Sequence, residues 1–332
     1  MMKKISSFVD YFQQYHESVT NPEGYWAKIA DTFQWHKKWD KVLDWNFTEP
    51  KIKWFDGGKL NITENIFERN LPARKDQVAL IWEPNDPKEP EKRITYGELF
   101  EKVCIFANAL KRQGIQKGDR VAIYLPMVPE LPIAMLACAR IGAIHSIVFA
   151  GFSANSLADR INDSACKMVI TADGLFRGSK NVGLKSIVDE ALQMCTSVEH
   201  VVVLKRTGDP VQMKEGRDIW WDAFIEGVSK ENKAEVMEAE DTLFILYTSG
   251  STGKPKGVLH TTAGYMVFAQ FTFLNVFQYN EGDIYWCTAD IGWVTGHTYI
   301  VYGLLLSGAT SIMFEGVPTY PDPGWFWEVV DK

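Results

Sequence analysis

The sequence predicts an α/β protein in which mostly parallel sheets are covered by helices on both faces. Short apolar runs at 119–125, 144–149, 167–171, 200–204 and 243–247 have the length and continuity of buried strands. Helix-length segments separate most of these runs, as the crossovers between parallel strands require. Ligands of such sheets bind beyond the carboxyl ends of the strands, so we expect functional loops to follow strands directly.

The opening 68 residues differ from the rest of the chain and predict a separate extension. Phe8, Phe12 and Tyr15 recur at helical spacing. Five tryptophans lie in the same stretch, namely Trp26, Trp35, Trp39, Trp45 and Trp54. We expect a helical segment that lies across the larger body and packs its tryptophans against it, because such rings more often pack than bind ligands.

The elements that follow have local start and stop signals. The charged, proline-rich stretch 82–93 predicts a surface loop. Thr95 and Glu98 form a capping box for a helix that runs to Gly114, where glycine suits a carboxyl-terminal cap. Further elements are predicted as helices at 129–141, 153–163 and 183–195 and as a strand at 284–288.

Composition and charge narrow the class of protein. Of the 332 residues, 46% are hydrophobic and 23% are charged, which is typical of a folded globular protein rather than a disordered one. Acidic residues outnumber Lys and Arg by 42 to 35, which argues against binding to nucleic acid over a broad surface. Charged residues and prolines interrupt the most apolar stretch, Val121 to Phe152, so no membrane span is predicted.

The amino terminus and the cysteines indicate a cytoplasmic protein. Asp10, Gln13 and Gln14 interrupt the opening stretch, which therefore lacks the apolar core of a signal peptide. The five cysteines form no C-x-x-C pair, and none stands beside a histidine at metal-ligand spacing. We therefore expect free thiols in a reducing compartment and no metal site built from them.

The residues after the strand at 243–247 form the segment with the clearest chemistry. They read Thr248-Ser249-Gly250-Ser251-Thr252-Gly253-Lys254-Pro255-Lys256-Gly257. Glycines let backbone N–H groups approach an anion, hydroxyls add donors, and lysines add charge. Each hydrogen bond to a charged group contributes about 1.5–3 kcal/mol, so a few of them would hold a polyphosphate. The sequence therefore predicts a phosphate-binding loop.

Two other interpretations of this loop fit less well. A flexible linker would share its Ser, Thr and Gly content, but a linker rarely begins directly after a buried strand. The Walker A pattern G-x-x-x-x-G-K-[ST] fails on spacing, because Pro255 stands five residues beyond Gly250 and also follows Lys254. No G-x-G-x-x-G occurs in the chain. The loop thus belongs to neither common class of nucleotide-binding loop.

The phosphate loop is part of a longer signature. The adenylate-forming superfamily of acyl-CoA synthetases, luciferases and peptide-synthetase adenylation domains has a phosphate-loop motif that resembles YTSGSTGKPKGVLH at 247–260. The acetyl-CoA synthetase branch resembles two further blocks, HSIVFAGFSANSLADRI at 145–161 and ADIGWVTGHTYIVYGLLLSGATSIMFEGVP at 289–318. The tryptophan-rich opening is similar to the extension of that branch. The resemblance implies an extension at 1–68 and an AMP-binding domain at 69–332.

The resemblance implies an acetate–CoA ligase that uses ATP, Mg²⁺ and coenzyme A. In that family, ATP and acetate give acetyl-AMP and pyrophosphate, and the CoA thiolate then displaces AMP. An anion must attack a polyanion, so the enzyme works through positioning and neutralisation of charge. By similarity, the residues that grip the β- and γ-phosphates are Thr248, Ser249, Gly250, Ser251, Thr252, Gly253, Lys254 and Lys256, with Mg²⁺ alongside.

The resemblance also assigns residues to CoA and to the acyl group. The family's CoA contacts fall on Arg177, Lys180, Thr295 and Thr319, and its acyl pocket falls beside Trp293 and Val294. Relatives have a second arginine at Lys180 and an asparagine at Thr319; Lys180 keeps the charge but loses the bidentate fork. On the residues alone, the two cations would be solvated in a loop and Trp293 would be an ordinary core aromatic.

The resemblance stops at Lys332, about halfway along the family's length. The later motif that holds adenine and metal, the ribose-binding Asp and the carboxy-terminal lid domain with its catalytic lysine fall outside this chain. We therefore expect a truncated chain with no certain catalytic residue of its own, which does not complete the reaction alone. Two alternatives remain open: a ligase for propionate or another short acid, and a non-catalytic nucleotide- or CoA-binding fragment.

Overall fold

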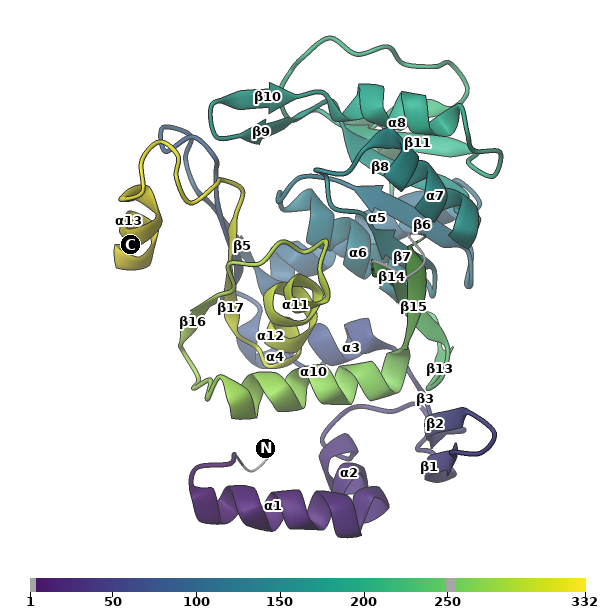
Figure 1. Ribbon diagram of the computed structural model, residues 1–332, viewed down its shortest axis with the longest axis vertical. Coiled ribbons are helices and arrows are strands. Elements are labelled where there is room, and N and C mark those ends of the chain that lie inside the picture. Colours follow the sequence, from purple (N-terminus) through teal and green to yellow (C-terminus); the bar gives the residue numbers. More distant parts are fainter. Residues whose placement is uncertain (1–3, 249–254) are drawn as a thin grey trace.

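Two sheets organise the chain in the computed structural model, which describes residues 4–248 and 255–332 (Figure 1). The larger sheet has seven strands in those residues, and all neighbours are parallel except the last pair. In spatial order the strands are β12 (Asp218–Trp220), β11 (His200–Leu204), β8 (Met168–Ala172), β6 (Arg120–Tyr124), β7 (Ile144–Ile147), β14 (Thr242–Thr248) and β15 (Lys256–Thr261).

The second sheet has four strands in the described part of the chain. Its order is β16 (Ile284–Trp286), β17 (Thr310–Phe314), β4 (Val78–Glu83) and β5 (Lys92–Thr95). The first three strands are parallel, and β5 returns antiparallel to β4. Three two-stranded pairs complete the strands: β1 (Lys41–Asn46) with β2 (Lys51–Asp56), β3 (Lys59–Leu60) with β13 (Met237–Glu238), and β9 (Leu175–Arg177) with β10 (Lys180–Val182).

Helices cover the sheets on both sides. In the upper half of Figure 1, α5 and α6 lie together on one face of the larger sheet, and α7 and α8 lie together on the other. The helices from α3 onward are α3 (Ile62–Ile66), α4 (Leu71–Arg74), α5 (Tyr96–Arg112), α6 (Glu130–Arg140), α7 (Ala154–Ser164), α8 (Leu184–Leu192), α9 (Trp221–Ile225), α10 (Thr262–Val276), α11 (Val294–Gly296), a π-helical turn (His297–Tyr302), α12 (Gly303–Leu306) and α13 (Trp325–Asp331). The predicted α/β class is confirmed.

Local signals placed several of these elements correctly. The Thr95 side chain accepts from the backbone of Glu98 while the Glu98 carboxylate accepts from the backbone of Thr95, so the predicted capping box is present at the start of α5. Helix α6 is buried along almost its whole length, as its apolar sequence requires. The stretch 82–93 is only partly the surface loop that its prolines predict, because Trp82 and Asn85 are buried.

The amino-terminal segment combines helices with strands. Helices α1 (Phe8–Thr20) and α2 (Pro22–Ala30) form as predicted, but the hairpin of β1 and β2 follows them. No residue of α1 is buried, and Phe8 and Phe12 are exposed. The tryptophans hold this segment in place instead: Trp26 and Trp54 pack against each other, and Trp26 also contacts Phe271 of α10.

None of the helices within the described residues is both long and apolar enough to cross a membrane.

Candidate functional site

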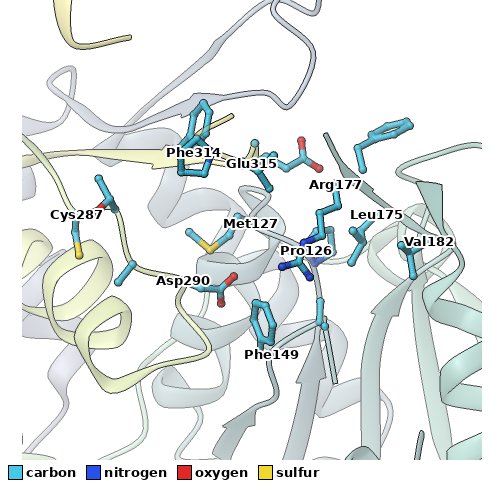
Figure 2. Close-up of a pocket in the computed structure, with 18 of the residues that line it drawn as sticks. Pro126, Met127, Phe149, Leu175, Arg177, Val182, Cys287, Asp290, Phe314 and Glu315 are labelled. Carbon is cyan, nitrogen blue, oxygen red and sulfur yellow. The ribbon is translucent and has the colours of Figure 1, made fainter. Parts of the chain in front are cut away.

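A cavity of about 340 Å³ lies where the carboxyl ends of the two sheets meet (Figure 2). The larger sheet supplies the segments that follow β6, β7 and β8, and the second sheet supplies those that follow β16 and β17. The lining includes Pro126, Met127, Phe149 to Phe152, Leu175 to Arg177, Trp286 to Asp290 and Phe314 to Pro318. This position is the one expected for a ligand site in a parallel α/β sheet.

The floor of the cavity is fixed by hydrogen bonds from buried aromatic side chains. The Tyr124 hydroxyl at the end of β6 lies 3.0 Å from the carbonyl oxygen of Ala150 and 2.7 Å from that of Phe152. The Trp82 indole N–H donates to the carbonyl of Met127 at 2.9 Å. The loops after β6 and β7 are therefore held rigidly, although neither has regular secondary structure.

The β9–β10 hairpin carries two predicted site residues, and one of them, Arg177, lines the cavity. Arg177 and Lys180 are directly paired across the strands and flank a two-residue turn. Gly178 occupies the first turn position at φ +61°, which suits the type II′ turn that such hairpins favour. Like charges directly opposite each other on a hairpin are destabilising, and neither cation forms a salt bridge with a described carboxylate. The pair is thus arranged to receive an anion.

Asp290 faces the same space as Arg177 and was not singled out from the sequence. Both side chains point into the cavity in Figure 2. Burial raises the pKa of the Asp290 carboxyl, while a hydrogen bond from the Gly292 N–H at 2.6 Å and the charge of Arg177 act in the opposite direction. Its position directly after a predicted strand was the available signal, since functional loops follow strands in this fold.

The residues predicted to border the acyl group lie behind the aromatic wall of the cavity. Trp293 is half exposed and its ring contacts those of Phe149 and Phe152, with centroids 6.1 and 6.3 Å apart. Val294 and Thr295 follow at the start of α11 and are also exposed. A Cβ at Gly296 would stand 2.2 Å from the carbonyl oxygen of Asp290, so only glycine allows this turn to close.

Thr319 is exposed in a segment that packs against the β9–β10 turn. A Cβ added to Gly178 would lie 3.4 Å from Val317 and from Tyr320, which flank Thr319. The fold therefore brings the segment of Thr319 to the hairpin of Arg177 and Lys180, although these residues are far apart in the sequence.

The predicted phosphate loop connects β14 to β15, which turns back antiparallel beside it. Thr248 and Lys256 are opposite each other at the end of this pair, and Lys256 is exposed. The remaining predicted phosphate contacts, Ser249, Gly250, Ser251, Thr252, Gly253 and Lys254, lie outside the described residues. The structure thus places the two ends of the loop at the carboxyl edge of the larger sheet.

Arg160 links this loop to the cavity wall and was also missed by the sequence reasoning. Its guanidinium stacks on the Phe152 ring at 4.7 Å and on the Tyr247 ring at 5.5 Å from the centroids. Tyr247 immediately precedes Thr248 and donates through its hydroxyl to Asp163 at 2.7 Å. The helix α7 therefore joins the base of the phosphate loop to the aromatic side of the cavity.

The described residues contain no cluster of side chains that could bind Mg²⁺ together. Residues 4–248 and 255–332 contain no group of three His, Cys, Asp or Glu side chains arranged around a common point. We therefore assign none of these described residues to a metal ion.

Comparison with known families agrees with this architecture. The sequence matches the AMP-binding enzyme family over residues 67–332. The chain belongs to the AMP-binding enzyme family. Residues 11–66 match a second family, the amino terminus of acetyl-coenzyme A synthetase. The resemblance drawn from the phosphate loop and the blocks at 145–161 and 289–318 is thereby confirmed.

Curated relatives of this AMP-binding enzyme are acetyl-coenzyme A synthetases. It is 56% identical to that of Bdellovibrio bacteriovorus over 323 residues, which cover 97% of this chain and 50% of the relative. It is 57% identical to that of Syntrophobacter fumaroxidans over 331 residues, covering 98% of this chain and 51% of the relative. The chain therefore spans about half the length of the curated relatives it matches.

A solved structure shares the fold. The acetoacetyl-CoA synthetase from Streptomyces lividans superposes with a TM-score of 0.88 at 25% sequence identity. The match covers 98% of this AMP-binding chain and 49% of that protein.

Proposed function

We propose that this chain forms part of an acetate–CoA ligase that activates acetate as acetyl-AMP with release of pyrophosphate. The acetyl group then passes to CoA, whose thiolate displaces AMP. The observation that carries the proposal is the cavity between the two sheets, which is lined by Arg177 of the cationic hairpin, in a chain similar to acetyl-coenzyme A synthetases. A cytoplasmic location and small-molecule partners belong to the same proposal.

The phosphate loop serves the first half-reaction in this proposal. Thr248 and Lys256, with the loop between them, bind the terminal phosphates of ATP. Positive charge and N–H donors there offset the repulsion between the acetate anion and the polyphosphate. Mg²⁺ accompanies ATP in this chemistry and neutralises further phosphate charge. Arg160 lies near the entrance of the loop and contributes to the positive potential of that region.

The cavity serves the second half-reaction. Arg177 and Lys180 bind the 3′-phosphate of CoA, and Thr295 and Thr319 add polar contacts. Trp293 and Val294 form the apolar surface next to the acyl group. The support for this assignment is that the segment of Thr319 packs against the hairpin beside the cavity, while the ring of Trp293 contacts Phe149, which lines the same cavity.

A chimaera tests the proposed activity. Residues 1–332 are fused to the second half of the Bdellovibrio relative, which begins where its similarity to this chain ends. We expect acetate-dependent exchange of pyrophosphate into ATP, followed by acetyl-CoA formation when CoA is added. A chimaera that folds and binds ATP but shows no acetate-dependent exchange would contradict the proposal. Propionate and butyrate in place of acetate measure the preference for chain length.

A further inference from the structure

Asn85 is a buried residue that binds the β9–β10 turn from a distant part of the chain. It lies in the loop after β4 and is only 3% exposed. Its side-chain Nδ2 donates to the carbonyl of Gly178 at 2.9 Å, and its Oδ1 accepts from the N–H of the same residue at 2.9 Å. The two bonds grip both polar groups of a single turn residue. A side chain in this geometry fixes the position and orientation of the turn.

The turn that Asn85 holds is flanked by Arg177, which lines the cavity, and by Lys180. Arg177 directly precedes Gly178 and Lys180 follows two residues after it, so a shift of the turn would displace both charges together. Three-residue strands on each side form few ladder bonds of their own. A two-stranded hairpin is marginally stable in water without packing. The position of the cations therefore depends on contacts from outside the hairpin.

Asn85 is itself fixed by the wall of the cavity. Its backbone lies beside the buried carboxylate of Glu315, just after β17, and acts to lower the pKa of that carboxyl, which burial raises. Glu315 in turn accepts two hydrogen bonds from Arg206, whose guanidinium also stacks on Phe176 of the hairpin with 4.9 Å to the ring centroid. The hairpin is thus tied to the second sheet by two routes, one through its turn and one through its first strand.

We propose that Asn85 is a positioning residue that sets the ability of the chain to distinguish CoA from CoA lacking the 3′-phosphate. Asn85 does not touch the ligand; it holds Gly178 and thereby fixes the positions of Arg177 and Lys180 on either side of the turn. Two donors that bind one phosphate lose most of their contribution to its binding free energy when their separation changes, because charge-assisted hydrogen bonds depend on distance and angle. This inference rests on the proposed role of Arg177 and Lys180 in CoA binding.

The test compares binding of CoA and of 3′-dephospho-CoA to the 332-residue chain by isothermal titration calorimetry. We expect the unaltered chain to bind CoA at least tenfold more tightly than dephospho-CoA. Asn85→Ala should reduce this ratio of affinities below threefold, because it weakens the binding of CoA alone. The affinity for dephospho-CoA should stay within twofold of its original value. Asn85→Asp keeps the acceptor but loses the donor, so its ratio should lie between the two. A general loss of folding would lower the affinity for both ligands equally.

Two controls separate the possible failures. Asn108→Ala removes an asparagine that also donates to two backbone carbonyls, but away from the cavity, and should leave the ratio unchanged. Lys180→Gln removes one proposed phosphate contact and should lower the ratio as Asn85→Ala does. If the unaltered chain binds both ligands equally, or neither, the proposed role of Arg177 and Lys180 is wrong and this inference falls with it. If the unaltered chain prefers CoA over dephospho-CoA and both Asn85 variants fold and keep the same preference, only the positioning role of Asn85 is overturned. If Asn85→Ala does not fold, the ratio measured for Asn85→Asp tests the positioning role instead.

Discussion

Arg206 and Glu315 form a bidentate pair that joins the loop after β11 to the end of β17. The Nε of Arg206 donates to Oε1 of Glu315 at 2.8 Å, and Nη2 donates to Oε2 at 2.6 Å. The Glu315 side chain is fully buried and lines the cavity. The pair therefore connects the two sheets at the place where the cavity lies between them.

We predict that removing one member of this pair destabilises the whole chain. Glu315→Ala should lower the free energy of unfolding by about 3–5 kcal/mol, because Arg206 would keep a buried charge without its strongest partner. Glu315→Gln should lower it less, since one hydrogen bond survives. Urea denaturation followed by circular dichroism measures both values. As a control, Glu91→Ala breaks the exposed pair with Arg93 and should change stability by less than about 1 kcal/mol.

The exposed Lys256 gives a prediction for nucleotide binding. Lys256→Gln should weaken binding of Mg²⁺-ATP by about tenfold to a hundredfold, the loss expected for one charge-assisted hydrogen bond of roughly 1.5–3 kcal/mol. Lys256→Arg should retain more of the affinity because it keeps the charge. Competition with a fluorescent ATP analogue measures the affinities. Lys233→Gln is the matched control, an exposed lysine elsewhere, and an equal effect there would show that Lys256 acts only through net charge.

The buried histidines predict an acid-sensitive fold. Burial lowers the pKa of His297 to about 4, and it lowers the pKa of His145 well below its ordinary value. The unfolded chain binds these protons near pH 6.5 whereas the folded chain does not, so stability is complete above that pH and falls on acidification. Each histidine contributes a slope of about 1.4 kcal/mol per pH unit, which for His297 extends from pH 6.5 down to about 4.

His297→Gln isolates this effect. Denaturant unfolding between pH 4.5 and 7 should show a shallower dependence of stability on pH for His297→Gln than for the unaltered chain. His16 is exposed on α1, and His16→Gln should leave the slope unchanged. Parallel curves for His297→Gln and the unaltered chain would mean that His297 does not control the acid response.

The contacts of Trp26 and Trp45 predict which part of the amino-terminal segment anchors that segment to the rest of the chain. Trp26 packs against Trp54 and Phe271, whereas Trp45 is 59% exposed. Trp26→Ala should lower the free energy of unfolding by about 2–4 kcal/mol through lost apolar contact. Trp45→Ala should change it by about 0.5 kcal/mol or less. Limited proteolysis provides a second readout, since only Trp26→Ala should release the segment before residue 60.

The sequence was informative where a structural signal is local. The capping box of Thr95 and Glu98 is complete within four residues, and the apolar runs that became β6 to β8 are each buried on both faces. The burial of Asn85 was not predictable in the same way. The prolines and charged residues around Asn85 are typical of a surface loop, and its partner Gly178 stands 93 positions later in the chain.

In the candidate site, too, the features set by neighbouring residues in the sequence could be predicted, and those set by long-range contacts could not. Its phosphate loop could be recognised from residue types alone, because donors, glycines and lysines are consecutive. Arg160 and Asp290 belong to no such run of residues, and a single charged residue has many ordinary roles; for Asp290, only its position after a predicted strand was informative. Arg160 became notable only when folding placed it between the rings of Phe152 and Tyr247, which are neighbours in space but not in sequence.

The late position of β17 has a consequence for synthesis. This strand lies between β4 and β16, so the second sheet cannot assemble until residues 310–314 have left the ribosome. Until then β4 pairs only with β5, and the backbone N–H and C=O groups along its other edge have no strand beside them. Bacterial and eukaryotic chains emerge at about 5–20 residues per second, so this open edge is unprotected for many seconds. We expect a nascent chain at this stage to bind chaperones, and slowed translation between β5 and β17 should increase its misassembly.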